Sequence, residues 1–180
     1  APSILDLCAA PGGFIATALR YNPTATVRGI SLPEELGGHP LLVPRGRADP
    51  QVSVAFFDIT MLGSEFGLDS CQYTIPKLSP ERPYYGQSFD LVFCDGQVLR
   101  THAQYRDEKR ERFEAQRLAC SQMILALQRI CEGGTLIMLL HKVEAWDTFQ
   151  ILCAFSGFAS VQLYKPKKCH ATRSSFYLIA

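Results

Sequence analysis

Short apolar runs alternate along the chain with segments in which apolar residues recur every three or four positions. The apolar runs predict strands that begin at Ser3 and then occupy residues 26–32, 52–57, 88–94, 135–140, 160–164 and 174–180. Helices are predicted over residues 13–22, 107–131 and 145–155. We expect Glu132-Gly133-Gly134 to end the second of these helices.

Strands that alternate with helices predict an α/β fold, with a mostly parallel sheet of seven strands and helices on both faces. The last two strands are joined by the basic segment 165–173 rather than by a helix, so we expect them to pair antiparallel. A chain of 180 residues can bury a substantial core, and we expect one domain over residues 1–180.

The turn that follows the first strand is built from small residues, Cys8-Ala9-Ala10-Pro11-Gly12-Gly13. Small residues between a strand and a helix let a ligand approach the backbone, where the first helical N–H groups are free to donate. The spacing fits neither the Gly-x-Gly-x-x-Gly motif of dinucleotide-binding proteins nor a phosphate loop. The turn therefore predicts a cofactor site of another class.

Three polar residues follow predicted strands. Asp58, Asp95 and Lys142 each stand at the carboxyl end of an apolar run. Ligands of parallel sheets bind at the carboxyl ends of the strands, so we expect these side chains to face the same crevice as the small-residue turn.

These segments together resemble the FtsJ-type ribose 2′-O-methyltransferases, which include rRNA, tRNA and cap enzymes. The motifs that carry the resemblance are residues 6–14, 58–60, 89–96, 139–142 and 165–166. The resemblance spans nearly the whole chain. It implies a Rossmann-like class I methyltransferase fold, S-adenosylmethionine as cofactor, and transfer of its methyl group to a ribose 2′-hydroxyl of RNA.

The family uses a Lys-Asp-Lys-Glu catalytic set, and the resemblance implies that Asp95 is its aspartate and Lys142 its second lysine, the general base. A ribose hydroxyl is a poor acid, so an amine within hydrogen-bond reach is suited to accept its proton. The glutamate position holds Ser175, which cannot supply a charge. The first lysine lies upstream in the family, so we expect the chain to be a fragment that lacks upstream sequence.

The resemblance also implies a set of cofactor-binding residues, in which Asp58 accepts from the adenine amino group and Ile59 packs on the ring. Asp58 could instead cap a helix. The second strand lacks the acidic residue that often holds the cofactor ribose, so Ser31 or the backbone would substitute. The full set is Asp6, Ala9, Ala10, Pro11, Gly12, Gly13, Phe14, Ser31, Asp58, Ile59 and Asp95.

Basic residues cluster before the last strand, close to the predicted crevice. The residues that we expect to contact RNA phosphates are Arg100, Lys165, Lys167, Lys168 and Arg173. The net charge of +1 neither supports nor excludes RNA binding. We expect no metal site and no membrane span, and the oligomeric state stays open.

The seven cysteines form no Cys-x-x-Cys pair, and Cys94 and Cys153 lie in apolar runs. We therefore expect reduced, buried thiols in an intracellular protein. Cytosine-5 methylation of RNA, which shares the small-residue turn, needs a nucleophilic cysteine after the fourth strand, and Cys94 is expected to point into the sheet. A catalytically impaired module that binds S-adenosylmethionine or RNA remains the main alternative, because of Ser175 and the missing ribose acid.

Overall fold

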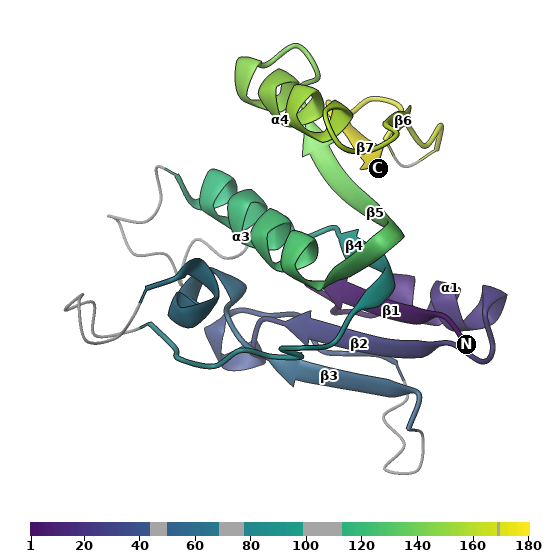
Figure 1. The fold of residues 1–180 in the computed structure, drawn as a ribbon, viewed down its shortest axis with the longest axis vertical. Coiled ribbons are helices and arrows are strands. Elements are labelled where there is room, and N and C mark those ends of the chain that lie inside the picture. Colours follow the sequence, from purple (N-terminus) through teal and green to yellow (C-terminus); the bar gives the residue numbers. More distant parts are fainter. Residues whose placement is uncertain (44–49, 69–77, 99–112, 169) are drawn as a thin grey trace.

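The computed structural model describes residues 1–43, 50–68, 78–98, 113–168 and 170–180. Its elements in chain order are β1 (Ser3–Leu7), α1 (Gly13–Tyr21), β2 (Thr26–Ser31), η1 (Glu34–Leu36), β3 (Val52–Phe56), η2 (Ile59–Met61), η3 (Gly63–Phe66), β4 (Phe89–Cys94), α3 (Glu114–Arg129), β5 (Ile130–His141), α4 (Trp146–Ser156), β6 (Gln162–Tyr164) and β7 (Ser175–Ile179). Figure 1 shows one twisted sheet with helices packed against it.

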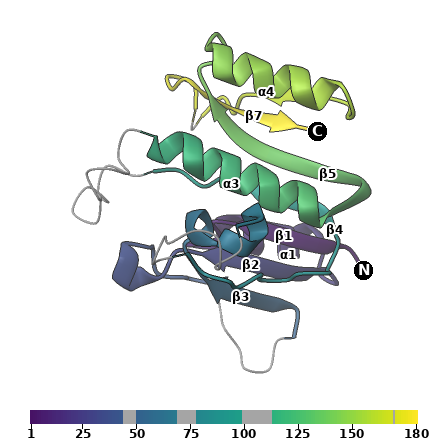
Figure 2. The same ribbon diagram turned by 60° about the vertical axis from the view of Figure 1, so that its left-hand side comes forward.

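The seven strands form one sheet in the order β3-β2-β1-β4-β5-β7-β6. β7 pairs antiparallel with both β5 and β6, and the other pairings are parallel. The predicted mostly parallel, seven-stranded sheet is confirmed, and so is the antiparallel pairing of the last two strands. β7 lies between β5 and β6, so the last strand of the chain inserts into the sheet and β6 forms its edge. Figure 2 shows β7 beside β5.

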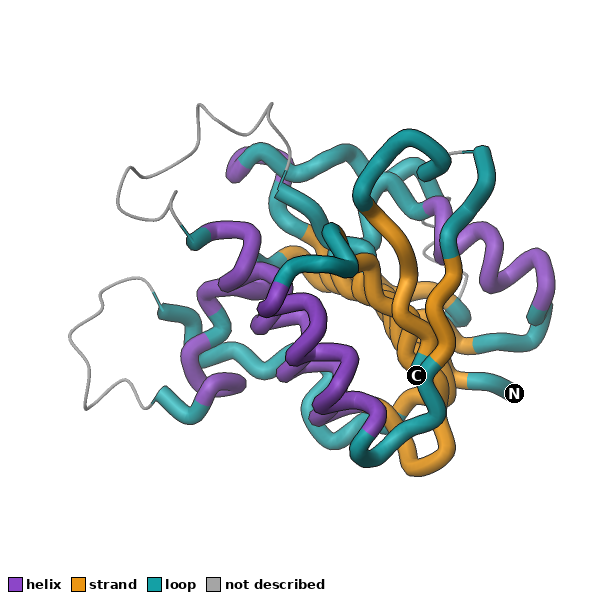
Figure 3. Tube along the Cα trace, turned by 90° about the horizontal axis from the view of Figure 1, so that it is seen from above, coloured by secondary structure: helices purple, strands orange, loops and turns teal. Residues whose placement is uncertain are grey.

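The helices cover both faces of the sheet, as predicted. Ile15 and Ala18 of α1 pack with Ile4, Val27 and Phe93 on one face. On the other face, α3 and α4 cover the strands, and in the view from above the strands lie between these two groups of helices (Figure 3).

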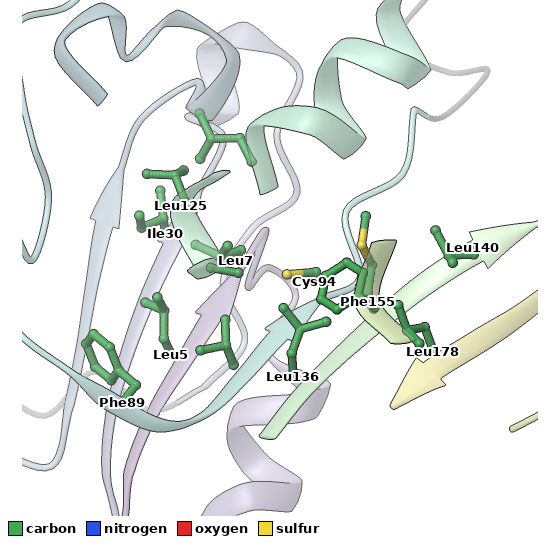
Figure 4. Close-up of a cluster of buried hydrophobic side chains, with 14 of the residues drawn as sticks. Leu5, Leu7, Ile30, Phe89, Cys94, Leu125, Leu136, Leu140, Phe155 and Leu178 are labelled. Carbon is green, nitrogen blue, oxygen red and sulfur yellow. The ribbon is translucent and has the colours of Figure 1, made fainter. Parts of the chain in front are cut away.

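The larger core cluster lies under α3 and α4. Leu5 and Leu7 of β1 and Leu136 of β5 belong to one buried cluster with Leu125 of α3 and Phe155 of α4 (Figure 4). Alternate residues of the strands face opposite sides, so Ile4 belongs to the α1 face and Leu5 to the α3 face. Burial on both faces explains why the strands appear in the sequence as continuous apolar runs.

The predicted boundary between the second long helix and the fifth strand is wrong. α3 ends at Arg129, and β5 begins at Ile130 instead of at residue 135. Ile130 pairs with Phe89, and the register shifts before Thr135 pairs with Leu91. The glycines therefore form an irregularity within the strand, and the pairing of Ile130 starts the strand before them. The predicted helix start, residues 107–112, lies outside the described residues.

A buried ion pair ties α3 to the segment after β3. The Arg129 guanidinium donates to Glu65, and the side chains are 2% and 0% exposed. Arg82 reaches the other oxygen of Glu65 at 3.3 Å, and its own side chain is 35% exposed. The Arg82 guanidinium also lies 3.7 Å from the ring centroid of Tyr85. These contacts fix the loop before β4 against α3.

We expect Arg129→Met to lower the free energy of unfolding by about 3–5 kcal/mol, because the buried Glu65 carboxylate loses its buried partner. Arg82→Met is the matched control and should cost about 1 kcal/mol or less, since its side chain is partly solvated. Urea denaturation of the three proteins measures both values. Equal losses for the two variants would contradict the ranking of the two ion pairs.

Candidate active site

A pocket of about 290 Å³ opens at the carboxyl ends of the parallel strands. It lies where the crevice was predicted, beside the small-residue turn. The predicted cofactor residues that line it are Ala10, Pro11, Ser31, Asp58, Ile59 and Asp95. Sequence reasoning missed other lining residues, which come from the loop after β2, the segment after β4 and the first turn of α3. Among them are His39, Gln97, Glu114 and Arg117.

The small-residue turn is held by its neighbours in the sheet and by the loop after β2. The Ala10 N–H donates to the Ser31 hydroxyl at 3.2 Å, and the Leu42 N–H donates to the Pro11 carbonyl at 2.9 Å. Gly12 has a φ of 108°, and a Cβ there would overlap the Val43 side chain. Packing against the protein itself thus requires glycine at this position, in addition to any approach of a ligand.

The other turn residues predicted for the cofactor belong to the same turn but are not among the residues that line the pocket. Ala9 is buried and would contact any side chain placed at Gly29. Gly13 begins α1 with open space around it. Phe14 stacks on Phe93, with ring centroids 4.6 Å apart. These residues follow β1 and so lie at the carboxyl end of that strand, as predicted. Their contact with a cofactor remains a prediction.

Asp6 is 2% exposed, and its Oδ2 atom has no hydrogen-bond partner. Burial raises the pKa of Asp6 from 3.8 to about 8, and the Asp95 carboxylate adds to the rise. An unpartnered buried carboxyl oxygen is costly, and it is suited to a cationic group of a ligand.

Asp58 caps the short helix η2 and lines the pocket. Its Oδ1 accepts from the Thr60 N–H at 2.9 Å and from the Thr60 hydroxyl at 2.7 Å. The capping role that the sequence left open is thus present. The same residue also faces the pocket beside the buried Ile59, so the two roles are compatible.

Asp95 lies at the edge of the pocket and faces a cluster of side chains from β5 and β7. The Tyr177 hydroxyl donates to Asp95 Oδ1 at 2.9 Å. Burial raises the pKa of Asp95, while the hydrogen bond from Tyr177 and the nearby His170 and His141 oppose that rise. Sequence reasoning did not predict these partners, because two of them lie 75 residues or more away along the chain.

The backbone after Asp95 is clamped by a buried glutamine of α3. The Gly96 N–H donates to Gln122 Oε1 at 2.8 Å, and Gln122 Nε2 donates to the Gly96 carbonyl at 3.2 Å. A Cβ at Gly96 would overlap the Cys8 sulfur. This arrangement fixes the path of the chain at the pocket wall.

Lys142 and Ser175 occupy the ends of the adjacent strands β5 and β7. Lys142 has a φ of 50°, its N–H donates to the Ser174 carbonyl, and its side chain is exposed. The positive charges that oppose the rise in the pKa of Asp95 are those of His170 and His141. Ser175 is buried, and its hydroxyl is hydrogen-bonded to His170 Nδ1. The catalytic roles assigned to Asp95, Lys142 and Ser175 remain predictions.

The basic loop between β6 and β7 is partly tied to itself. Lys165 Nζ donates to the Arg173 carbonyl at 2.8 Å. Lys167, Lys168 and Arg173 are exposed, as contact with RNA would require. Arg100 lies outside the described residues.

Two cysteines close to the pocket are unsuited to nucleophilic attack. Burial raises the pKa of the Cys8 and Cys94 thiols well above their usual range, and nearby carboxylates add to the effect. A thiolate, the reactive form, is therefore disfavoured at both positions. Cys94 is buried in the sheet as predicted, whereas Cys120 is exposed and so is Cys153, which corrects the expectation of buried thiols. Cys153 lies on the outer side of α4, where the apolar run continues to the surface.

Within the described ranges, no group of three or more His, Cys, Asp or Glu residues is arranged to hold a metal ion. No helix in this part of the chain is long and apolar enough to cross a membrane.

We expect the stability of the protein to fall as the pH rises from about 4 to about 8, and Asp6→Asn to remove much of that fall. Folding holds a proton on Asp6 that the unfolded chain has already released in this window, so each pH unit costs up to about 1.4 kcal/mol. Denaturant unfolding at several pH values measures the difference between the two proteins. The exposed Glu81→Gln is the control, and a constant difference between Asp6→Asn and the parent would contradict the buried, protonated Asp6.

We expect Gln122→Met to lower the free energy of unfolding by about 1–3 kcal/mol, because it leaves the Gly96 N–H and carbonyl without their partner. The exposed Gln150→Met on α4 is the matched control and should change stability by roughly 0.5 kcal/mol or less. Thermal and urea unfolding measure both. Similar values for the two variants would show that the clamp contributes little.

The comparisons with known proteins agree with the motifs. Residues 2–180 match the family model described as FtsJ-like methyltransferase. No curated protein matches the chain.

Among solved structures, the chain is similar to one described as a ribosomal RNA methyltransferase from Plasmodium falciparum, with a TM-score of 0.60 and 19% identity over 99% of this chain and 85% of that chain. Human methyltransferase-like protein 13 in complex with SAH gives a TM-score of 0.58 and 9% identity over 99% and 71%. An rRNA methylase from Streptococcus thermophilus gives 0.54 and 11% over 99% and 84%.

At these identities the solved structures establish the fold alone, and they confirm the predicted methyltransferase fold. The match to the family model covers almost the entire sequence and confirms the resemblance inferred from the motifs. The chain therefore belongs to the FtsJ-like methyltransferase family.

Proposed function

We propose that this protein transfers a methyl group from S-adenosylmethionine to a ribose 2′-hydroxyl of RNA. The observation that carries the proposal is the pocket at the strand ends, which joins the small-residue turn, Asp58 and Asp95 in one place. Membership of the FtsJ-like methyltransferase family supports the reaction class. Two structurally similar proteins are described as rRNA methyltransferases, which favours RNA as the substrate.

The residues present fit S-adenosylmethionine. The cofactor is a cation, and positive charge beside the unpartnered Oδ2 of Asp6 would oppose the rise in its pKa and favour an ionised carboxylate there, next to Asp95. Asp58 and Ile59 would hold the adenine, and Ser31 lines the same pocket where a ribose acid is absent. When bound, the cofactor supplies an electrophilic methyl group. A structurally similar methyltransferase was solved with SAH, which favours a cofactor of this type.

Lys142 and Asp95 have the two remaining catalytic roles in this proposal. The amine of Lys142 accepts the proton of the 2′-hydroxyl as that oxygen becomes methylated. Asp95 is held by Tyr177 and carries negative charge beside the cofactor pocket, where it complements positive charge and orients the amine.

The exposed basic loop between β6 and β7 gives RNA a place to bind. Lys167, Lys168 and Arg173 can contact phosphates without displacing a buried partner. Such contacts position the RNA without reading its sequence, so the loop fits an RNA substrate of any sequence.

A second candidate function is an accessory module that keeps the fold and binds S-adenosylmethionine or RNA without efficient transfer. Ser175 favours this candidate, because its buried hydroxyl is engaged by His170 and supplies no charge. Calorimetry with S-adenosylmethionine, followed by transfer of labelled methyl groups to mixed RNA by the full-length protein, separates the two. Binding without transfer would favour the module.

We expect Lys142→Ala and Lys142→Arg each to reduce methyl transfer about 100-fold or more while leaving the affinity for SAH within about threefold. Alanine removes the amine, and arginine keeps a positive charge but cannot act as a base at neutral pH. Transfer of labelled methyl groups and calorimetry with SAH provide the two measurements. Transfer by either variant at the rate of the parent would refute Lys142 as the base.

A further inference from the structure

His170, from the basic loop between β6 and β7, lies close enough to Asp95 for its charge to act on that carboxylate. His170 Nδ1 is hydrogen-bonded to the Ser175 hydroxyl. The His170 ring meets the Tyr177 ring edge-on, with centroids 5.5 Å apart. The hydroxyl of that same tyrosine donates to Asp95 at 2.9 Å. A continuous series of contacts therefore runs from Ser175 through His170 and Tyr177 to the wall of the pocket.

The strand register explains why these side chains meet. In the antiparallel pair β5–β7, His141 is opposite Ser175, and Leu139 is opposite Tyr177. Directly opposed residues project to the same face of the sheet, and alternate residues of one strand do so too. Tyr177 also contacts Phe14 edge-on, so this is the face that α1 covers.

The backbone of the loop fixes His170 as well. The His170 N–H donates to the Pro166 carbonyl at 3.3 Å, and the Arg173 N–H donates to the His170 carbonyl at 3.1 Å. The half-buried imidazole is thus held by main-chain bonds on both sides and by Ser175 through its ring.

We propose that His170 is a positioning residue of this site, which braces the Tyr177 ring and so aims the phenol hydroxyl at Asp95. The inference rests on the proposed function, because Asp95 is assigned there to the reaction. Ser175, in turn, fixes the imidazole. Loss of His170 lets the Tyr177 ring tilt, and Asp95 then loses a donor that restrains its carboxylate at the pocket wall.

His170 also acts through its charge. The titratable groups that act on it or contact it are Asp95 after β4, His141 at the end of β5 and Tyr177 on β7, and its own loop carries Lys165 and Arg173. Burial lowers the pKa of His141, the positive charge of His170 lowers it further, and Asp95 opposes both. Removal of His170 should therefore let His141 keep its proton to a higher pH.

Imidazole NMR titration of the apoprotein tests the placement without any activity. We expect the titration midpoint of His141 to move to higher pH in His170→Gln, and to stay unchanged in Thr172→Val, an exposed control on the same loop. Ser175→Ala should shift the ring resonances of His170. A His141 midpoint that is the same in the parent and in His170→Gln would overturn the proposal.

Kinetics test the positioning role. We expect His170→Gln to lower the rate of methyl transfer at saturating S-adenosylmethionine by about 10-fold to 100-fold, as a small displacement of a reacting group does, with the KM for the cofactor changed about threefold or less. His170→Asn, which can keep a polar contact to Ser175, should recover part of the rate. A loss as large in Thr172→Val, or a full rate in His170→Gln, would overturn the proposal.

The two assays separate this proposal from the proposed function. A parent protein that binds SAH but transfers no methyl group would remove the 2′-O-methyltransferase assignment, while the shift of the His141 midpoint would still support the contacts of His170. If transfer occurs and His170→Gln leaves both the midpoint and the rate unchanged, the positioning role fails and the enzyme assignment stands.

Discussion

Two carboxyl groups, those of Asp6 and Asp95, lie at the carboxyl ends of β1 and β4, and the rest of the site depends on burial and on their mutual repulsion, which together keep a proton on Asp6 near neutral pH. Asp6 pairs in register with Phe93, and Asp95 follows two residues later, so parallel pairing forces both acids to the same end and face of the sheet. Burial and mutual repulsion raise the pKa of Asp6. A site of this kind favours positive charge, and α1 adds free N–H groups because Gly12 provides no side-chain cap.

The geometry of the pocket wall depends on close contacts that leave no room for larger residues. Val43 packs onto Gly12, and Cys8 with Gln122 packs onto Gly96. In both places a loop after one strand touches a segment from another part of the chain. The small residues of the motif therefore serve the packing of the protein as much as the approach of a ligand, and the two requirements act on the same positions.

The sequence predicted the sheet and the crevice well, because both depend on patterns of neighbouring residues. Apolar runs mark buried strands, and the polar residues that follow them fall at one edge of a parallel sheet. The start of β5 was missed, since the pairing of Ile130 with Phe89 depends on the neighbouring strand. The clamp of Gln122 on Gly96 and the contact of Tyr177 with Asp95 join residues 26 and 82 positions apart, and no local pattern marks such pairs.

The identity of residue 175 is coupled to the charge of this site. A carboxylate there would add negative charge to the face where Asp95 already lies, and it would need a cation nearby. Serine adds no charge, and its hydroxyl can hold a histidine in either protonation state. Burial and the charge of His170 lower the pKa of His141, so His141 supplies positive charge beside Asp95 only at lower pH. With serine at this position, the charge next to Asp95 is therefore set by a histidine that titrates instead of by a fixed carboxylate.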